Sequence, residues 1–117
     1  MTNNQVITLP KPPSVNHMYG RSGHRTYVTP KGVAWFEEAG YELLRQWKRK
    51  TIKGEVALYI KYYYCGRWDW DNGNKCLSDL LTKQRVYEDD KQVNFAQIET
   101  IRVKHRDEQK VEIEIGY

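Results

Sequence analysis

The segment EVALYIKYYYC, Glu55–Cys65, has the strongest strand signal of the sequence. It is rich in β-branched and aromatic residues, which are enriched in strands. Side chains on a strand alternate between its two faces, so every second residue shares a face. The apolar residues that share one face here are Val56, Leu58, Ile60, Tyr62 and Tyr64. We therefore expect a strand over 55–65 with one apolar face.

Two segments have the apolar spacing of amphipathic helices. In residues 31–49 apolar side chains recur every three or four positions, Thr29 is suited to cap the amino end, and Pro30 suits the first helical position. Residues 74–85 repeat the same spacing. The side chains expected to be buried are Val33, Phe36, Gly40, Leu43, Leu44 and Trp47 in the first helix and Leu77, Leu80 and Leu81 in the second.

Three more segments are predicted to be strands. Residues 5–10 form a short strand that Pro10 ends, residues 93–105 a strand with a bulge, and residues 110–117 a strand in which apolar and acidic residues alternate. We expect 105–110 to be a hairpin between the last two strands, and 11–28 to be irregular. The fold class is α/β (α+β), with a small mixed β-sheet packed against two main helices in a single domain over 1–117.

Composition limits the location and the partners of the protein. Lys and Arg total 19 against 15 Asp and Glu, and this net charge of +4 permits a polyanionic partner. Cys65 and Cys76 are too few for a four-thiolate zinc site, and we expect both to be reduced and buried. The amino-terminal residues lack the pattern of a secretory signal, and no apolar run is of membrane-spanning length. We expect a cytoplasmic protein.

Acidic residues gather directly after the strand, in the segment RWDWDNGNKCLSDL over 67–80. If the strand continues, Asp69 and Asp71 point to the same side with their backbones about 6.5 Å apart. Two such carboxylates can bind one hard cation, or a pair of cations about 4 Å apart. Because neither His nor Cys stands close to them in a ligand pattern, they favour Mg²⁺, with Mn²⁺ as a substitute, over Zn²⁺. Asn72 is expected to cap the following helix.

Further charged residues can join these two acids. Lys75 falls on the first turn of the predicted helix, with Asp79 four residues on and on the same face. Asp89 and Asp90 lie in the turn VYEDDKQ. A carboxylate-bound Mg²⁺ polarises a phosphoryl oxygen and activates water, while a lysine neutralises developing charge. The combination is typical of phosphodiester hydrolysis.

Each of these features also has a purely structural interpretation. The two aspartates can cap a strand-to-helix turn, since short polar side chains bond to nearby backbone amides. Lys75 and Asp79 alone can be a solvated helix pair, and the acids at 88–90 a polar turn.

Together the segments resemble the RusA family of Holliday junction resolvases. ITLPKPPSVNHMY, at 7–19, is similar to the opening of that family. The signature of the family resembles residues 69–81, DWDNGNKCLSDLL. A third segment of the family is similar to residues 86–93, VYEDDKQV. The pattern departs at Trp68 and Trp70, where charged or aliphatic residues are expected.

The resemblance implies a homodimer that binds branched DNA, especially four-way junctions, and makes one Mg²⁺-dependent cut per subunit in DNA recombination and repair. By position, Asp69, Asp71 and Asp90 match the essential, metal-binding acids and Lys75 the essential lysine. Asp79 and Asp89 are assigned supporting roles. The implied source is bacterial, or a phage or prophage.

A polar, basic loop near the amino terminus suits phosphate contacts and base stacking. The residues expected to contact DNA are Asn16, His17, Tyr19, Arg21, Arg25 and Arg67. Two other functions stay open: a non-catalytic module for branched or single-stranded nucleic acid, in which the acids are structural, and another carboxylate–metal enzyme that acts on a nucleotide-linked substrate. The absence of a Gly-rich phosphate loop in the sequence argues against the second.

Overall fold

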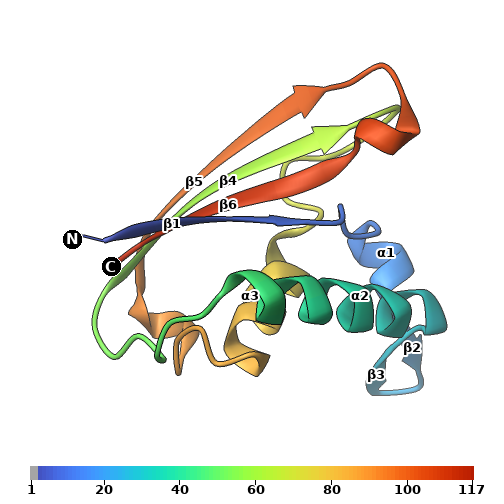
Figure 1. The fold of residues 1–117 in the computed structure, drawn as a ribbon. Helices are drawn as coiled ribbons and strands as arrows, with labels where there is room; N and C mark the ends of the chain where they lie inside the picture. The colour runs from blue at the N-terminus through green and yellow to red at the C-terminus, as the bar shows by residue number, and fades with distance from the viewer. Residues whose placement is uncertain (1–2) are drawn as a thin grey trace.

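The computed structural model describes residues 3–117. Its main sheet has four strands in the order β1-β6-β4-β5, and the two longer helices, α2 and α3, cover one face of that sheet (Figure 1). The strands are β1 (Asn4–Leu9), β4 (Val56–Tyr64), β5 (Val93–Arg102) and β6 (Lys110–Gly116), and the helices are α2 (Pro30–Gln46) and α3 (Asn74–Lys83). The mixed α+β fold with a small sheet and two main helices is confirmed.

Strand β4 lies inside the sheet, as its apolar sequence allows. It pairs in parallel with β5 on one side and antiparallel with β6 on the other. The parallel pairing needs a crossover, and α3 supplies it between β4 and β5. The expected bulge occurs near the start of β5, where Val93 pairs with Val56 but Phe95 pairs with Ala57.

The prediction of a hairpin between the last two strands is wrong, because β4 lies between β5 and β6. The connection includes the short 3-10 helix η2 (Arg106–Glu108) and crosses the end of β4. There the amide of Val103 donates to the carbonyl of Tyr64 at 2.8 Å, and the amide of Cys65 donates to Oε1 of Gln109 at 2.9 Å. Alternation predicts which face of a strand is buried, but it does not predict which strand lies beside it.

Helix α2 begins as predicted, since the hydroxyl of Thr29 accepts from the amide of Gly32 at 3.0 Å and Pro30 is the first residue. It ends earlier than predicted, at Gln46. Gly40, Leu43 and Trp47 are buried as predicted, but two of the predicted residues are not. Val33 and Leu44 are 45% and 58% exposed. The buried residues are Gly32, Trp35, Ala39, Gly40 and Leu43.

Two glycines of α2 lie against neighbouring elements, and only Gly40 was among the residues predicted to be buried. A β-carbon on Gly32 would lie 2.5 Å from the carbonyl oxygen of Met18, and one on Gly40 would lie 2.9 Å from Nε2 of Gln84. The helix therefore turns these two positions toward its neighbours, although a pattern of apolar side chains gives glycine little weight. Within residues 3–117, no helix is both long and apolar enough to span a bilayer.

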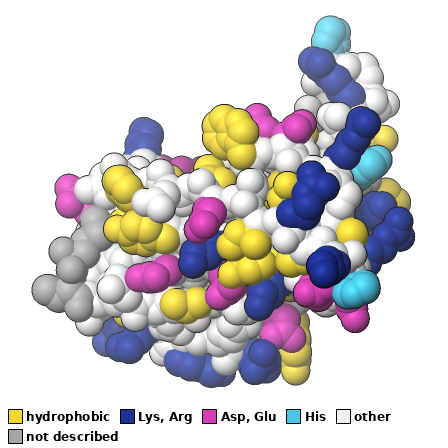
Figure 2. Space-filling view, turned by 90° about the horizontal axis from the view of Figure 1, so that it is seen from above, with side chains coloured by type: hydrophobic (Ala, Val, Ile, Leu, Met, Phe, Trp, Pro, Cys, Tyr) yellow, Lys and Arg dark blue, Asp and Glu magenta, His cyan; other side chains and the backbone are white. Residues whose placement is uncertain are grey.

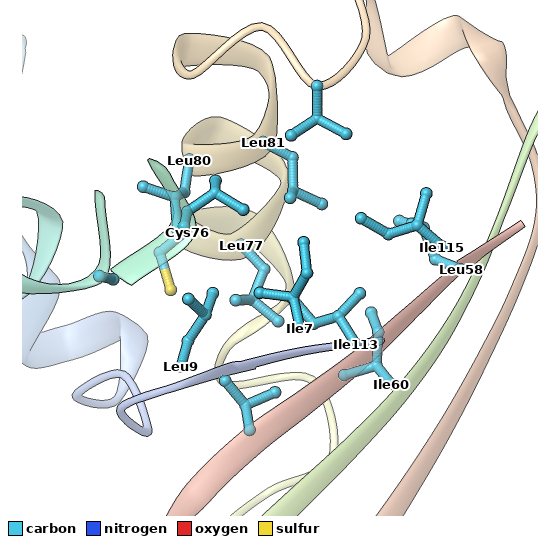
Figure 3. Packing of buried hydrophobic residues seen from close by; sticks show 14 of the residues in the cluster. Ile7, Leu9, Leu58, Ile60, Cys76, Leu77, Leu80, Leu81, Ile113 and Ile115 are labelled. Atoms are coloured by element: carbon cyan, nitrogen blue, oxygen red, sulfur yellow. The ribbon is translucent and has the colours of Figure 1, made fainter. Parts of the chain in front are cut away.

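The core lies between the sheet and α3 (Figure 3). In that view Leu77, Leu80 and Leu81 of α3 point toward the apolar side chains of β1, β4 and β6. The three leucines are buried, as predicted. Cys76 is buried too, and burial raises the pKa of its thiol to about 12, so it stays protonated. Cys65 is only half-buried, which corrects the expectation for that residue.

The segment expected to be irregular, 11–28, contains regular structure. It forms the short helix α1 (Val15–Met18) and a separate hairpin of β2 (Tyr19–Ser22) and β3 (Arg25–Val28). The hairpin turns at Gly23, whose φ of 61° suits glycine. Closely spaced prolines and glycines concealed these elements, because each is only four residues long.

Candidate functional site

The acidic turn, residues 65–74, connects β4 to α3. Asp69 and Asp71 are exposed and lie beyond the end of β4, so the prediction that they share a strand face is wrong. Instead the chain folds on itself: the amide of Asn72 donates to the carbonyl of Asp69 at 3.0 Å, and that of Asn74 donates to the carbonyl of Asp71 at 3.3 Å. Both carboxylates are thus presented by one turn rather than by a strand.

Tyr62, near the end of β4, holds this turn in place. Its ring packs on Trp68 with centroids 5.3 Å apart, and its hydroxyl donates to Oδ1 of Asn74 at 2.7 Å. A β-carbon on Gly73 would lie 2.7 Å from the same ring. Tyr62 itself has no exposed surface. Trp68 therefore anchors the turn, whereas Trp70 is 63% exposed and points to no partner among the described residues.

The start of α3 differs from the prediction. Gly73, not Asn72, occupies the capping position, and no side chain caps the helix there. The close approach of the Tyr62 ring explains the glycine, because any larger residue would collide with it. Lys75 follows on the first turn and is exposed.

Lys75 and Asp79 both contact Tyr19. The Tyr19 hydroxyl donates to Oδ2 of Asp79 at 2.7 Å, and the Nζ of Lys75 lies 4.5 Å from the centre of the Tyr19 ring. Burial, and then the hydrogen bond to Asp79, raise the pKa of Tyr19, so the hydroxyl stays protonated as a donor. Asp79 thus fixes the ring that lies under the Lys75 ammonium group.

Of the two neighbouring aspartates in the later turn, only one faces this region. The carboxylate of Asp89 accepts from the amide of Lys91 at 2.9 Å and caps the 3-10 helix η1 (Asp90–Gln92). Oδ1 of Asp90 accepts from the hydroxyl of Thr82 at 2.8 Å. Asp90, Asp79 and Tyr19 line one cavity of about 310 Å³. The geometry favours Asp90 for chemistry and a structural role for Asp89.

Asp69 lines a different cavity, which holds about 670 Å³. We call it the amino-terminal pocket; it lies between residues 11–17 and the acidic turn. Asn16, His17 and Arg67 also line it, so these three predicted residues are brought together. Arg21 and Arg25 lie instead on the β2–β3 hairpin. Figure 2 shows Lys, Arg and His side chains gathering at the right-hand end of the view, with acidic side chains beside them.

The structure does not place Asp69, Asp71 and Asp90 close enough together to bind one metal ion. Among residues 3–117, no three His, Cys, Asp or Glu side chains are close enough together to hold a metal ion. Mg²⁺, however, is usually bound by one or two carboxylates together with substrate phosphates and water. The exposed carboxylates of the acidic turn are oxygen donors of the kind that such a site uses.

Sequence reasoning missed two lysines in this region. Lys11 and Lys31 line the amino-terminal pocket, and the Nζ of Lys11 lies 4.0 Å from the centre of the Trp68 ring. Lys11 stands beside the Pro-Pro pair that carries the family resemblance, which was a usable signal. Lys31 belongs to the first turn of α2, and no sequence pattern connects it with the acidic turn.

Changing Tyr19 tests how Lys75 is positioned. We expect Tyr19→Phe, which keeps the ring, to retain more cleavage activity than Tyr19→Leu, which removes it. A cation–π contact at an exposed site contributes about 0.5–1 kcal/mol, so the two turnover rates should differ about two- to fivefold. Single-turnover cleavage of a synthetic junction at saturating protein measures this difference.

Tyr63 gives a matched control for that experiment. It lies under Lys110, with Nζ 4.9 Å from its ring centre, and its hydroxyl bonds to Glu112. A similar lysine–tyrosine–acid arrangement therefore recurs at Tyr63, which is close to the acidic turn in sequence but points to the opposite face of β4 from Tyr62. Tyr63→Phe and Tyr63→Leu should cleave alike, and a Tyr19 pair that behaves in the same way would contradict the positioning role.

Comparison with known proteins agrees with the family resemblance of the sequence. A model of the family described as endodeoxyribonuclease RusA matches residues 10–116. The chain is also similar to the crossover junction endodeoxyribonuclease RusA of Escherichia coli O1:K1, of strain K12 and of strain CFT073. Each is 32% identical over 93 residues, which cover 78% of this chain and 78% of the relative.

Proposed function

The chain belongs to the RusA family of endodeoxyribonucleases, and from this premise we propose that it resolves four-way DNA junctions by paired, Mg²⁺-dependent cleavage of phosphodiester bonds. The observation that carries the proposal is the acidic turn, in which Tyr62 holds an exposed pair of aspartates beside Lys75. The surrounding basic side chains suit a polyanionic substrate. Recombination and repair of DNA are the processes that need such an activity.

We propose Asp69, Asp71 and Asp90 as the metal ligands. Because Asp69 and Asp90 line different cavities, the three would have to draw together around the metal and the substrate phosphates, where Lys75 would neutralise developing charge. Bound Mg²⁺ supplies Lewis-acid polarisation of the phosphoryl oxygen and a more acidic water. Lys75 needs a fixed position for this role, because preorganised charge is worth more than mobile charge. Tyr19 and Asp79 supply that position, since they support the lysine from below. Asp79 therefore acts as a supporting residue. Asp89 is also proposed as a supporting residue, because it caps η1, of which Asp90 is the first residue.

We also propose that the whole chain is one catalytic domain that works as a homodimer on branched DNA. A four-way junction needs two cuts, and each chain provides one acidic turn, so a two-fold dimer matches the substrate. The residues proposed to contact DNA are Asn16, His17, Tyr19, Arg21, Arg25 and Arg67. We propose a cytoplasmic location, which the bacterial source of the relatives supports because an endodeoxyribonuclease needs access to DNA.

The alternative is a non-catalytic module that binds branched DNA. A cleavage assay separates the two functions. The protein is mixed with a synthetic four-way junction or with linear duplex of the same sequence, in Mg²⁺, in Mn²⁺, or with a chelator. We expect paired nicks in the junction with either metal, little cutting of duplex, and none with the chelator. Junction binding without cleavage in either metal would support the alternative and refute ours.

A further inference from the structure

The amino-terminal pocket is lined by two lysines, Lys11 and Lys31, and by a single acid, Asp69. Burial, and then the charge of Lys31, lower the pKa of Lys11, so the two ammonium groups repel each other. Within residues 3–117 neither lysine forms an ion pair with a carboxylate. Lys11 is half-buried and Lys31 is exposed, so solvent screens this repulsion only in part.

The geometry of Lys11 leaves it little freedom to avoid this repulsion. Its ammonium group lies 4.0 Å from the centre of the Trp68 ring, and Trp68 packs on the buried Tyr62. The ring of Trp68 thus contacts both the buried Tyr62 and the ammonium group of Lys11. The strength of a cation–π contact falls with distance, so this contact holds the charge inside the pocket.

The pocket also has the size and the lining of an anion site. Its volume of about 670 Å³ lies within the range of about 300–1,000 Å³ that is typical of ligand pockets. Arg67 adds a third cation to the lining, while Asn16, Asn72 and Gln109 add neutral donors. Asp69 is the single acid in this lining. A phosphate bound by the lysines would therefore lie in the same cavity as a carboxylate of the acidic turn.

We infer that Lys11 and Lys31 together bind one phosphate group of the DNA backbone in the amino-terminal pocket. The inference rests on the proposed function for the identity of its ligand. A shared phosphate explains why two cations lie together, because an anion between them converts repulsion into two charge-assisted contacts. It also gives Trp68 a second role, since the residue that anchors the acidic turn also supports one of the phosphate-binding lysines.

Three variants test the inference: Lys11→Met, Lys31→Met and the double variant. Methionine keeps most of the length of the side chain and removes its charge. Binding to a synthetic four-way junction is measured in EDTA, so that the DNA stays intact, over a series of salt concentrations. Lost phosphate contacts lower the slope of log K against log salt by about 0.9 each. If both lysines hold one phosphate, either lysine alone still neutralises it, so each single variant should keep a slope close to that of the parent and the double variant should lose about one contact.

Lys61→Met is the matched control, because Lys61 is an exposed lysine of β4 that lines none of these cavities. It should leave the salt slope unchanged. Thermal unfolding provides a second readout: Lys31→Met should be no less stable than the parent, since it relieves repulsion in the free protein.

Each outcome has a distinct meaning. If the parent does not bind junctions, the proposed function itself fails. If the parent binds but the double variant keeps the salt slope of Lys61→Met, the phosphate pocket is refuted. A double variant that loses two contacts would show two separate phosphates and would also overturn the shared site. A Lys31→Met protein that is less stable yet binds normally would give the lysine a structural role.

Discussion

Asp71→Asn should reduce junction cleavage by at least about 100-fold while junction binding stays close to that of the parent. The substitution removes a charged oxygen donor from the exposed acidic turn, and even residues that only support metal ligands cost about 10–100-fold when they are changed. Binding should persist because it depends on the contacts of Lys and Arg with phosphates. Single-turnover cleavage in Mg²⁺ and a binding titration in EDTA measure the two effects separately.

Asp107→Asn is the control for this change. Asp107 is exposed in η2, far along the chain from the acidic turn, and the substitution makes the same change in charge. It should cleave at the parental rate. If Asp71→Asn also cut at that rate, Asp71 would not be a metal ligand, and the assignment of the acidic turn would fail with it.

Gly73→Ala should destabilise the protein by about 1–3 kcal/mol, the usual cost of forcing an extra group into packed surroundings. The new methyl group would lie 2.7 Å from the Tyr62 ring. That ring cannot move aside easily, because it has no exposed surface and its hydroxyl bonds to Asn74. The acidic turn must shift instead, so cleavage should fall as well. Thermal or denaturant unfolding measures the loss of stability.

Gly54→Ala gives the comparison, since nothing lies within 4 Å of a β-carbon at that position. The same substitution in open space should be neutral, or should stabilise by up to about 1 kcal/mol by restricting the unfolded chain. Equal unfolding free energies for the two variants would show that the Tyr62 ring yields, and that it does not hold the turn rigidly.

The elements with strong local patterns were predictable from the sequence. Strand β4 combines alternation with β-branched residues, and α2 has both a capping threonine and a proline in first place. These signals arise within a few neighbouring residues, so they do not depend on the rest of the fold. The leucines of α3 were predicted to be buried for the same reason.

The arrangement of the site was less predictable, because it depends on contacts between distant residues. The alternation of side chains along a strand led to the prediction that Asp69 and Asp71 share a strand face. However, β4 ends at Tyr64, and the chain then folds around the Tyr62 ring. Likewise, Lys75 and Asp79 are correctly spaced for a helix pair, yet both contact Tyr19, which lies 60 positions before Asp79 in the sequence. No pattern within one segment contains such a contact.

The order of strands in the sheet has a consequence for the newly made chain. β6 is the last strand to be synthesised, and it inserts between β1 and β4. Until it does, the amino-terminal strand has no neighbour in the sheet and β4 lacks one of its two. The acidic turn, which Tyr62 of β4 holds, therefore leaves the ribosome before its support is complete. The acidic turn gains its full support only once β6 has joined the sheet.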